Sequence, residues 1–419
     1  MPVIDSTSMA SEPVAQATPV LMIVENLPVP FLRRTWQAAC ALRDAGYRVS
    51  IISPKGRGYE ASYEKLEGIE IYRHKVYEAS GVAGYLLEYA GALAAEFWLA
   101  WKVYARTRFR VLHVGNPPDF LFLLGLAFRL FGVRFIYEFL DLNPELYLVK
   151  FGRRDLVYRM LCFLERCSFR TAHAVLAANE SYRAMALERG GVDPARVFIL
   201  LGTPEPKRIR LQPPQPHLKE GRPFLVIYLG VMGPQDGVDL LLASIEHITR
   251  ERQRTDILFA LIGSGTEFPR LKALASARGL DAHVRFTGLI SEEDLAAYLS
   301  TADVCVAPDP SNPMNDRCTM TKVLEYMAYG RPVVQFDLPQ GRLTAADAAL
   351  YARPNDPRDF AEQVLKLLDS EALRRELGAR GRKRIEGTLS WENAKRQLLA
   401  AYRTALGGAA AAAAPDGSS

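Results

Sequence analysis

A cation and a carboxylate stand three residues apart at the start of a predicted helix within Cys318–Gly330. Thr319 or Thr321 can cap this helix, and its first N–H groups then form a positive end that suits a phosphate. Lys322 and the helix end would hold a diphosphate, while Glu325, on the same face, would accept hydrogen bonds from a ribose diol. An ordinary amphipathic helix with a surface Lys–Glu pair has the same pattern.

The residues just before this helix offer further polar contacts. Asp316 and Arg317 end a polar loop that begins at Ser311, and Thr319 and Met320 follow it. We expect these residues to contact the hydroxyl groups of a sugar beside the nucleotide. A solvated loop is the alternative.

Glycines mark two upstream loops between a predicted strand and a predicted helix. A glycine has no Cβ, so its backbone can approach a phosphate or a sugar closely, although tight structural turns need the same residue. A later strand end could present backbone groups to a base. The donor-binding candidates in these loops are Gly230, Met232, Gly233, Gln235, Gly263, Gly265, Leu289 and Ile290.

Two carboxylates in the N-terminal half could serve a second substrate. Asp141 and Glu145 lie on either side of Pro144, after a predicted strand. A carboxylate in such a place can take a proton from a hydroxyl group or bind a sugar hydroxyl, whereas capping of the next helix is the alternative. Asp141 and Glu145 are therefore the candidate catalytic residues.

Other residues of this half could form an acceptor side. A group of basic residues, which includes Arg33, Arg34 and Arg153, would bind a diphosphate lipid carrier or an anionic membrane, unless it is merely solvated. Asn116 and Asp119 flank two prolines and could equally form a turn and a helix cap. The acceptor-side candidates are Asn26, Pro28, Arg33, Arg34, Asn116 and Asp119.

The sequence shows no metal-binding pattern. The five cysteines lack zinc spacing, and no Asp-x-Asp run occurs in a suitable loop. We therefore expect no bound metal, so that the helix end and nearby cations would stabilise a departing diphosphate.

Short apolar runs alternate with helical segments, which is typical of parallel α/β sheets. This pattern runs from residue 19 to 205, stops in a proline-rich linker over 206–222, and restarts over 223–388. A C-terminal helix over 389–406 can pack back across the junction, and the tails 1–18 and 407–419 have disordered compositions. The prediction is two Rossmann-like, doubly wound domains facing a central cleft, with ligands at the carboxyl ends of the strands.

Composition narrows the function further. Lys and Arg (52) exceed Asp and Glu (47) by only 5 in 419 residues, which is too little to indicate a nucleic-acid partner. The cysteine usage and the lack of a signal-peptide pattern favour a reducing cytoplasm. Gly84–Tyr104 and Phe120–Phe135 are apolar but contain charges, so we expect half-buried helices or contact with a bilayer surface, not a span.

The order and spacing of the motifs resemble those of GT-B glycosyltransferases. The C-terminal segments similar to the nucleotide half of that family are Tyr228–Asp239, Leu261–Gly265, Val284–Ile290 and Thr319–Gly330. The N-terminal segments similar to a bacterial, surface-polysaccharide branch of the retaining family-four enzymes are Val24–Phe31, Asn116–Asp119 and Asp141–Tyr147.

Some positions depart from the family pattern. Retaining relatives commonly carry Glu-x7-Glu; its second position is Glu325, but its first is Arg317. An Arg and a Lys of the first glycine loop are replaced by Val231 and Asp236. The acidic position that follows Pro-Phe is Leu32, so the acceptor side has lost polar groups.

The resemblance implies a retaining hexosyltransferase that moves a sugar from a UDP- or GDP-sugar to a lipid-linked glycan. It would act in the cytoplasm, at the inner face of the membrane, with the nucleotide sugar as co-substrate and no cofactor. A catalytically weak protein that binds a nucleotide sugar or glycan is one alternative, and a nucleotide-sugar epimerase is another. A dinucleotide dehydrogenase is disfavoured because no G-x-G-x-x-G follows Val20–Ile23.

Overall fold

A computed structural model describes residues 17–75, 82–205 and 209–408, without the side chains of residues 82–90 and 92. The predicted disordered tails lie almost wholly outside the described residues, as does the start of the predicted linker.

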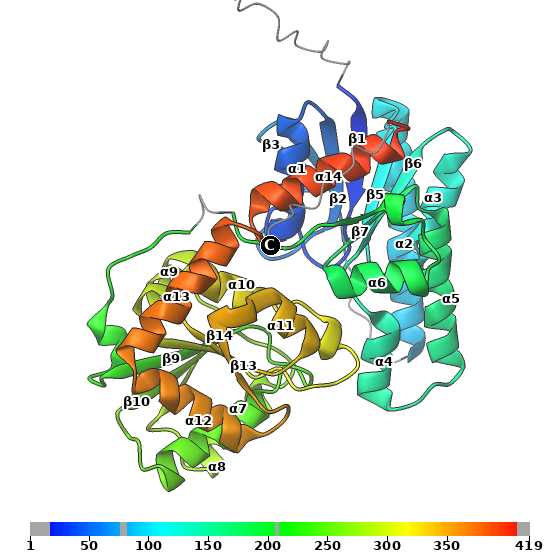
Figure 1. Cartoon of the computed structure of the whole chain (residues 1–419). Coiled ribbons are helices and arrows are strands. Elements are labelled where there is room, and N and C mark those ends of the chain that lie inside the picture. Colours follow the sequence, from blue (N-terminus) through cyan, green and yellow to red (C-terminus); the bar gives the residue numbers. More distant parts are fainter. Residues whose placement is uncertain (1–16, 76–81, 206–208, 409–419) are drawn as a thin grey trace, which may run out of the picture.

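The N-terminal domain is built on an eight-stranded sheet with the strand order β3-β4-β2-β1-β5-β6-β7-β8 (Figure 1). Neighbouring strands pair in parallel, except that β3 and β4 are antiparallel. The strands are β1 (Pro19–Ile23), β2 (Arg48–Pro54), β3 (Tyr63–Leu66), β4 (Ile69–His74), β5 (Val111–Gly115), β6 (Arg134–Phe139), β7 (Ala174–Ala177) and β8 (Val197–Ile199). The helices are α1 (Arg33–Asp44), α2 (Val82–Thr107), α3 (Phe122–Arg129), α4 (Asn143–Phe151), α5 (Leu156–Thr171) and α6 (Glu180–Glu188).

The C-terminal domain has a six-stranded parallel sheet with the order β11-β10-β9-β12-β13-β14. The strands are β9 (Phe224–Leu229), β10 (Ile257–Ile262), β11 (Val284–Gly288), β12 (Val304–Ala307), β13 (Val333–Phe336) and β14 (Ala349–Ala352). The helices are α7 (Val238–Glu246), α8 (Phe268–Ala277), α9 (Glu292–Thr301), α10 (Thr321–Ala328), α11 (Pro339–Ala345), α12 (Pro357–Leu368) and α13 (Glu371–Glu386). The two doubly wound domains confirm the predicted fold class.

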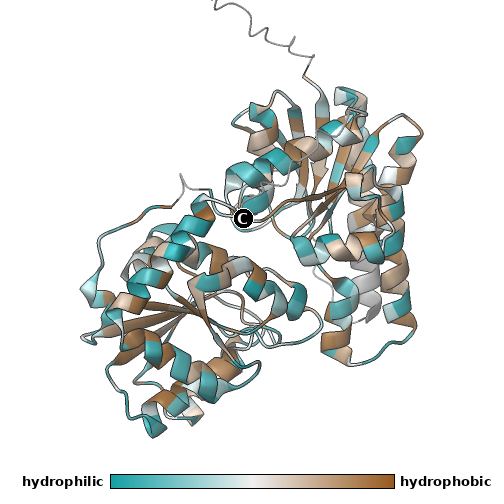
Figure 2. Cartoon of the chain, in the orientation of Figure 1, coloured by the Kyte–Doolittle hydropathy of each residue, from teal (hydrophilic) through white to brown (hydrophobic). Residues whose placement is uncertain are grey.

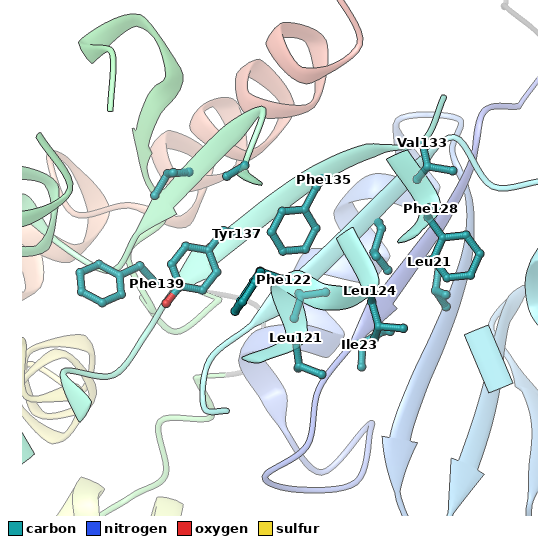
Figure 3. Close-up of a cluster of buried hydrophobic side chains, with 14 of the residues drawn as sticks. Leu21, Ile23, Leu121, Phe122, Leu124, Phe128, Val133, Phe135, Tyr137 and Phe139 are labelled. Carbon is teal, nitrogen blue, oxygen red and sulfur yellow. The ribbon is translucent and has the colours of Figure 1, made fainter. Parts of the chain in front are cut away.

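Both sheets are apolar inside and covered by helices whose outer surfaces are more hydrophilic (Figure 2). Side chains of strand β6 point alternately to the two faces of the sheet and so contribute to two hydrophobic clusters. Phe135, Tyr137 and Phe139 project into an aromatic cluster on one face of the sheet (Figure 3). Ile136 lies in the cluster on the other face, and Glu138 is buried there beside a histidine.

The last helix, α14 (Trp391–Ala405), lies against the N-terminal domain although it follows the C-terminal one (Figure 1). Leu398 and Tyr402 are fully buried in the same cluster as Trp36 of α1. The Tyr402 hydroxyl lies 2.8 Å from Nδ1 of His113 on β5. The chain thus crosses between the domains twice, and α14 completes the core of the N-terminal domain.

The hairpin of β3 and β4 was not expected from the sequence. Its outer strand, Tyr63–Leu66, is short and half exposed, so it has no continuous apolar run. The pairing of β4 with β2 places the end of β4 beside the functional edge of the sheet.

Truncation of Leu398 should test the packing of α14. Leu398→Ala removes a fully buried side chain, so we expect the free energy of unfolding to fall by about 2–5 kcal/mol. Arg396→Ala, on the exposed side of the same helix, is the control and should change it by less than about 0.5 kcal/mol. Urea denaturation of both variants measures the difference; equal losses would contradict the packing.

Candidate functional site

The N-terminus of α10 has no side-chain cap. Met320 occupies the N-cap position and makes no capping hydrogen bond, so the predicted cap by Thr319 or Thr321 is wrong. The Thr319 hydroxyl instead accepts hydrogen bonds from Asn179 Nδ2 (3.1 Å) and Gln340 Nε2 (3.2 Å). The positive end of α10 therefore keeps N–H groups that no side chain has taken, which suits an anion.

Lys322, the predicted diphosphate ligand, is buried and paired. Its Nζ lies 2.8 Å from Oδ1 of Asp309 and 4.8 Å from the centre of the Tyr228 ring. Burial alone lowers the pKa of an ammonium group, but the Asp309 carboxylate outweighs this and raises the pKa of Lys322. A Cβ on Gly230 would lie 3.2 Å from Lys322 Cε, so this charge sits directly behind the first glycine loop. A phosphate on that loop would share Lys322 with Asp309.

Glu325, the predicted ribose ligand, is half-buried and faces a polar pocket of about 300 Å³ between the domains. Burial raises the pKa of Glu325, and the charge of Arg33 opposes that shift. Arg33 lines the same pocket, where its Nη2 lies 2.7 Å from Oε1 of Glu292 on α9. Arg33 was predicted on the acceptor side, but the structure places it beside the candidate ribose site.

The glycine loops pack against each other. A Cβ on Gly263 would overlap the carbonyl oxygen of Gly230, and one on Gly265 would overlap that of Met232. Both glycines are thus explained by close approach of two backbones. Met232 itself is fully buried in the core, and its N–H and C=O bond to Ser264 and Glu267, so it offers no donor contact and that prediction is wrong.

The remaining candidates of this domain lie on or near its surface. Leu289 is exposed and Ile290 half-buried at the end of β11. Arg317 is exposed and donates to the carbonyl of its own loop, while one oxygen of Asp316 accepts a bond from Ser311 at 3.3 Å. Of the first glycine loop, Gly230 and Gln235 are half-buried, and Gly233 is buried with its N–H bonded to Asp236.

Asn315 was missed by sequence reasoning. It is buried, and its Nδ2 donates to the carbonyl of Gln235 at 2.9 Å. It therefore ties the loop before α10 to the first glycine loop. A lone Asn in a polar loop carries no signal that could have revealed this role.

Asn116 and Asp119 support a loop and do not face an acceptor. The Asn116 amide oxygen accepts bonds from the N–H groups of Leu140 (2.7 Å) and Asp141 (3.1 Å), and Nδ2 donates to Asp119. Asp119 is buried and also accepts from the Tyr137 hydroxyl at 2.8 Å. Asn116 and Asp119 were predicted to contact the acceptor. Their burial and their hydrogen bonds within the protein contradict that prediction, and they position Asp141 instead.

Glu145 is also a structural residue. It is buried, and its Oε1 lies 2.6 Å from Nη1 of Arg189, whose Nη2 lies 2.6 Å from Oε2 of buried Glu165. A carboxylate held this way cannot reach a substrate hydroxyl. The predicted catalytic role of Glu145 is wrong, because the interior requires that charge to pair with Arg189.

Asp141 differs from Glu145 because it is exposed. Even so, the protein around it, together with the charge of Asp119, raises its pKa to about 6. Burial, and to a smaller extent the charge of Asp141, raises the pKa of Cys318 in the opposite domain to about 11. The charge of Asp141 therefore influences Cys318, which precedes α10 in the other domain.

Arg34 belongs to a buried network at the base of the cleft. Its Nε lies 2.8 Å from Oε1 of Glu138, whose Oε2 lies 3.1 Å from Nε2 of His113. Burial alone would raise the pKa of Glu138, but Arg34 and His113 lower it to about 2. Arg34 is thus held as a positioning group. Of the other acceptor-side candidates, Asn26 is exposed and Pro28 is buried.

The three-dimensional arrangement defines a class of protein. Two doubly wound domains place an uncapped helix N-terminus and a carboxylate on opposite sides of one cleft. This architecture is that of the GT-B fold. Sucrose-phosphate synthase from Thermosynechococcus elongatus has the same fold, with a TM-score of 0.77 and 20% identity over 93% of this chain and 99% of that one. A structure from Anabaena in complex with UDP and glucose gives a TM-score of 0.65 and 14% identity over 91% and 98% of the two chains.

Sequence comparisons agree domain by domain. A family model described as "Glycosyl transferase 4-like domain" matches residues 32–201, and one described as "Glycosyl transferases group 1" matches 223–370. A D-inositol 3-phosphate glycosyltransferase from Geodermatophilus obscurus is 30% identical over 197 residues, which are 45% of this chain and 42% of that protein. The alignment thus spans less than half of that relative. The chain therefore combines the GT-B fold with a match to a glycosyltransferase family model in each of its two domains.

Removal of Arg189 should expose the structural role of Glu145. Arg189→Met leaves two buried carboxylates without their cation, so we expect a loss of about 3–5 kcal/mol in the free energy of unfolding at neutral pH. Arg166→Met, at an exposed position of α5, is the control. Denaturant unfolding measures the free energy of unfolding of both variants. A loss in Arg189→Met no larger than that in Arg166→Met would contradict a structural role for the ion pairs of Arg189.

Proposed function

We propose that this protein is a retaining glycosyltransferase that moves a sugar from a UDP- or GDP-sugar to a hydroxyl group of a lipid-linked glycan in surface-polysaccharide assembly. One observation carries the proposal. Helix α10 begins without a side-chain cap, and Glu325, one turn further on, lines a pocket between the two domains. A nucleotide sugar seated on α10 would present its sugar to an acceptor held at Asp141.

The donor side suits a nucleoside diphosphate. The helix end and Lys322 supply positive charge where a diphosphate leaves, and Glu325 offers a carboxylate for a ribose diol. UDP in the Anabaena structure with the same fold supports this class of ligand.

In the proposed reaction the acceptor oxygen attacks the anomeric carbon from the face that the diphosphate leaves. The bond from that carbon to the phosphate oxygen breaks, and the acceptor proton passes to the departing phosphate. Asp141 would orient the acceptor hydroxyl, and the end of α10 would stabilise the charge on the diphosphate. No metal is needed at this site in the proposal.

A lipid-linked acceptor requires contact with a membrane surface. Helices α2, α3 and α5 cover one face of the N-terminal sheet and carry exposed apolar side chains, among them Trp98, Leu126 and Phe163. In α3 and α5 every exposed charged side chain is an arginine. Such a surface suits an anionic bilayer. Among the described residues, the helices are too short or too polar to cross a membrane.

Glu325→Gln should weaken nucleotide binding. The amide keeps the shape but loses the charge-assisted acceptor, so we expect the free energy of binding of the nucleoside diphosphate to weaken by about 1.5–3 kcal/mol. Glu293→Gln, in the same pocket, is the matched control and should bind normally. Isothermal titration calorimetry with UDP and GDP measures the affinities of both variants. An unchanged affinity in Glu325→Gln would contradict the assignment of Glu325 to the ribose.

Asp141→Asn should lower the transfer rate without changing donor affinity. The carboxyl group of Asp141 is ionised above its pKa of about 6, so wild-type turnover should rise as the pH passes through this value. The variant should lose this dependence, whereas Glu188→Gln, an exposed carboxylate of the same domain, should keep it. The assay uses extracted lipid-linked glycans and a radiolabelled nucleotide sugar.

The same assay separates the alternatives. If the protein binds a nucleotide sugar but transfers the sugar neither to lipid-linked nor to simple acceptors, it is the catalytically weak binding protein named above as an alternative. Interconversion of free nucleotide sugars would identify an epimerase.

Phe163→Ala should weaken membrane contact. Phe163 is 63% exposed on α5, so its loss removes apolar surface without disturbing the core. We expect binding to vesicles of anionic phospholipid to fall about tenfold, since burying a Phe contributes about 1.5–3 kcal/mol. Leu343→Ala, at an exposed apolar position of the C-terminal domain, is the control for vesicle co-sedimentation. Equal binding of the two variants to vesicles would contradict the assignment of this surface to membrane contact.

A further inference from the structure

Three residues far apart in the sequence meet at the carboxyl edge of the N-terminal sheet. Glu25 follows β1, His74 ends β4, and Glu96 lies in α2. Each offers one ligand atom, and these atoms all lie within 4.8 Å of one another. His74 is 7% exposed, Glu96 is fully buried, and Glu25 is half-buried.

The hydrogen bond of His74 determines which of its nitrogens faces the cluster. Its Nδ1 lies 3.2 Å from the carbonyl oxygen of Lys75, and a carbonyl can only accept. Nδ1 therefore carries a hydrogen, and in the neutral imidazole Nε2 is the nitrogen that can bind a cation. Histidines that bind metals commonly have one ring nitrogen held in this way.

The cluster contains acceptors but no donor. Among the described residues, His74 Nε2, both oxygens of Glu96 and Oε1 of Glu25 are buried and have no hydrogen-bond partner. Buried lone pairs that converge in this way need a positive charge among them, either a proton or a metal cation.

We propose that Glu25, His74 and Glu96 bind a divalent transition-metal cation such as Zn²⁺ or Mn²⁺. One imidazole nitrogen and two carboxylates are a donor set that such ions accept. Ligands about 2.0–2.2 Å from an ion can lie up to about 4 Å apart, so a small inward movement of the side chains completes the site.

The ion would join two strand ends to α2. The loop that carries Asn26 and Pro28 starts at Glu25, so the cation would hold this loop at the rim of the cleft. The site lies in the N-terminal domain and uses none of the groups assigned to nucleotide binding. A test of the metal site is therefore independent of a test of the proposed transfer reaction.

Metal titration of the full chain, expressed without a polyhistidine tag and treated with a chelator, tests this site. We expect one Zn²⁺ per chain by calorimetry, a rise in melting temperature, and a visible absorption band when Co²⁺ is used instead. Glu96→Gln should fold, because its amide can donate to Glu25, but should bind Zn²⁺ at least tenfold more weakly. His74→Gln should do the same.

His247→Gln is the matched control. His247 also lies between two carboxylates, with Nδ1 3.1 Å from Glu251 and Nε2 3.3 Å from Glu362, but in the C-terminal domain. It should leave Zn²⁺ binding unchanged. Three results would each contradict the proposed site: no 1:1 binding of Zn²⁺ by the wild type, equal binding by Glu96→Gln, or loss of binding in His247→Gln. The first result would indicate that Glu25 and Glu96 share a proton instead.

Discussion

Parallel strand pairing is the constraint on which the site depends. Strands that run in the same direction end at the same edge of a sheet, so the loops that follow them are brought together whatever their distance in sequence. Asp141 follows β6, and the loop into α10 follows β12. The two edges face each other across the cleft, and that arrangement turns separate motifs into one site.

Several polar contacts join the two domains, including Ser181 to Gln340 at 2.6 Å. Asn179 donates to the carbonyl of Arg317 at 2.9 Å as well as to Thr319, and Arg33 pairs with Glu292. The Arg33–Glu292 pair is largely exposed, so it contributes little stability. The main bond between the domains is the return of α14, whose apolar face is part of the N-terminal core.

Buried charges explain why several motif residues have structural roles. A charge inside a protein must be paired, and Lys322, Glu145 and Glu138 each meet an opposite charge within 2.8 Å. In the case of Lys322 the pair also lies directly behind the first glycine loop. Glu145 has no such second role, because Arg189 holds both of its oxygens.

The sequence alone determined the fold class, since alternating apolar runs and helices with glycine-marked loops admit few other arrangements. It also predicted a helix around Glu325 and a strand before Asp141, because local periodicity and the order of elements are properties of neighbouring residues. Only the tertiary structure decided which carboxylates stay accessible and which are buried in ion pairs, as with Asp141 and Glu145. It alone brought together Glu25, His74 and Glu96. These residues lie 22 to 71 positions apart, and contacts over such distances depend on strand order and helix packing, for which a single sequence carries no local signal.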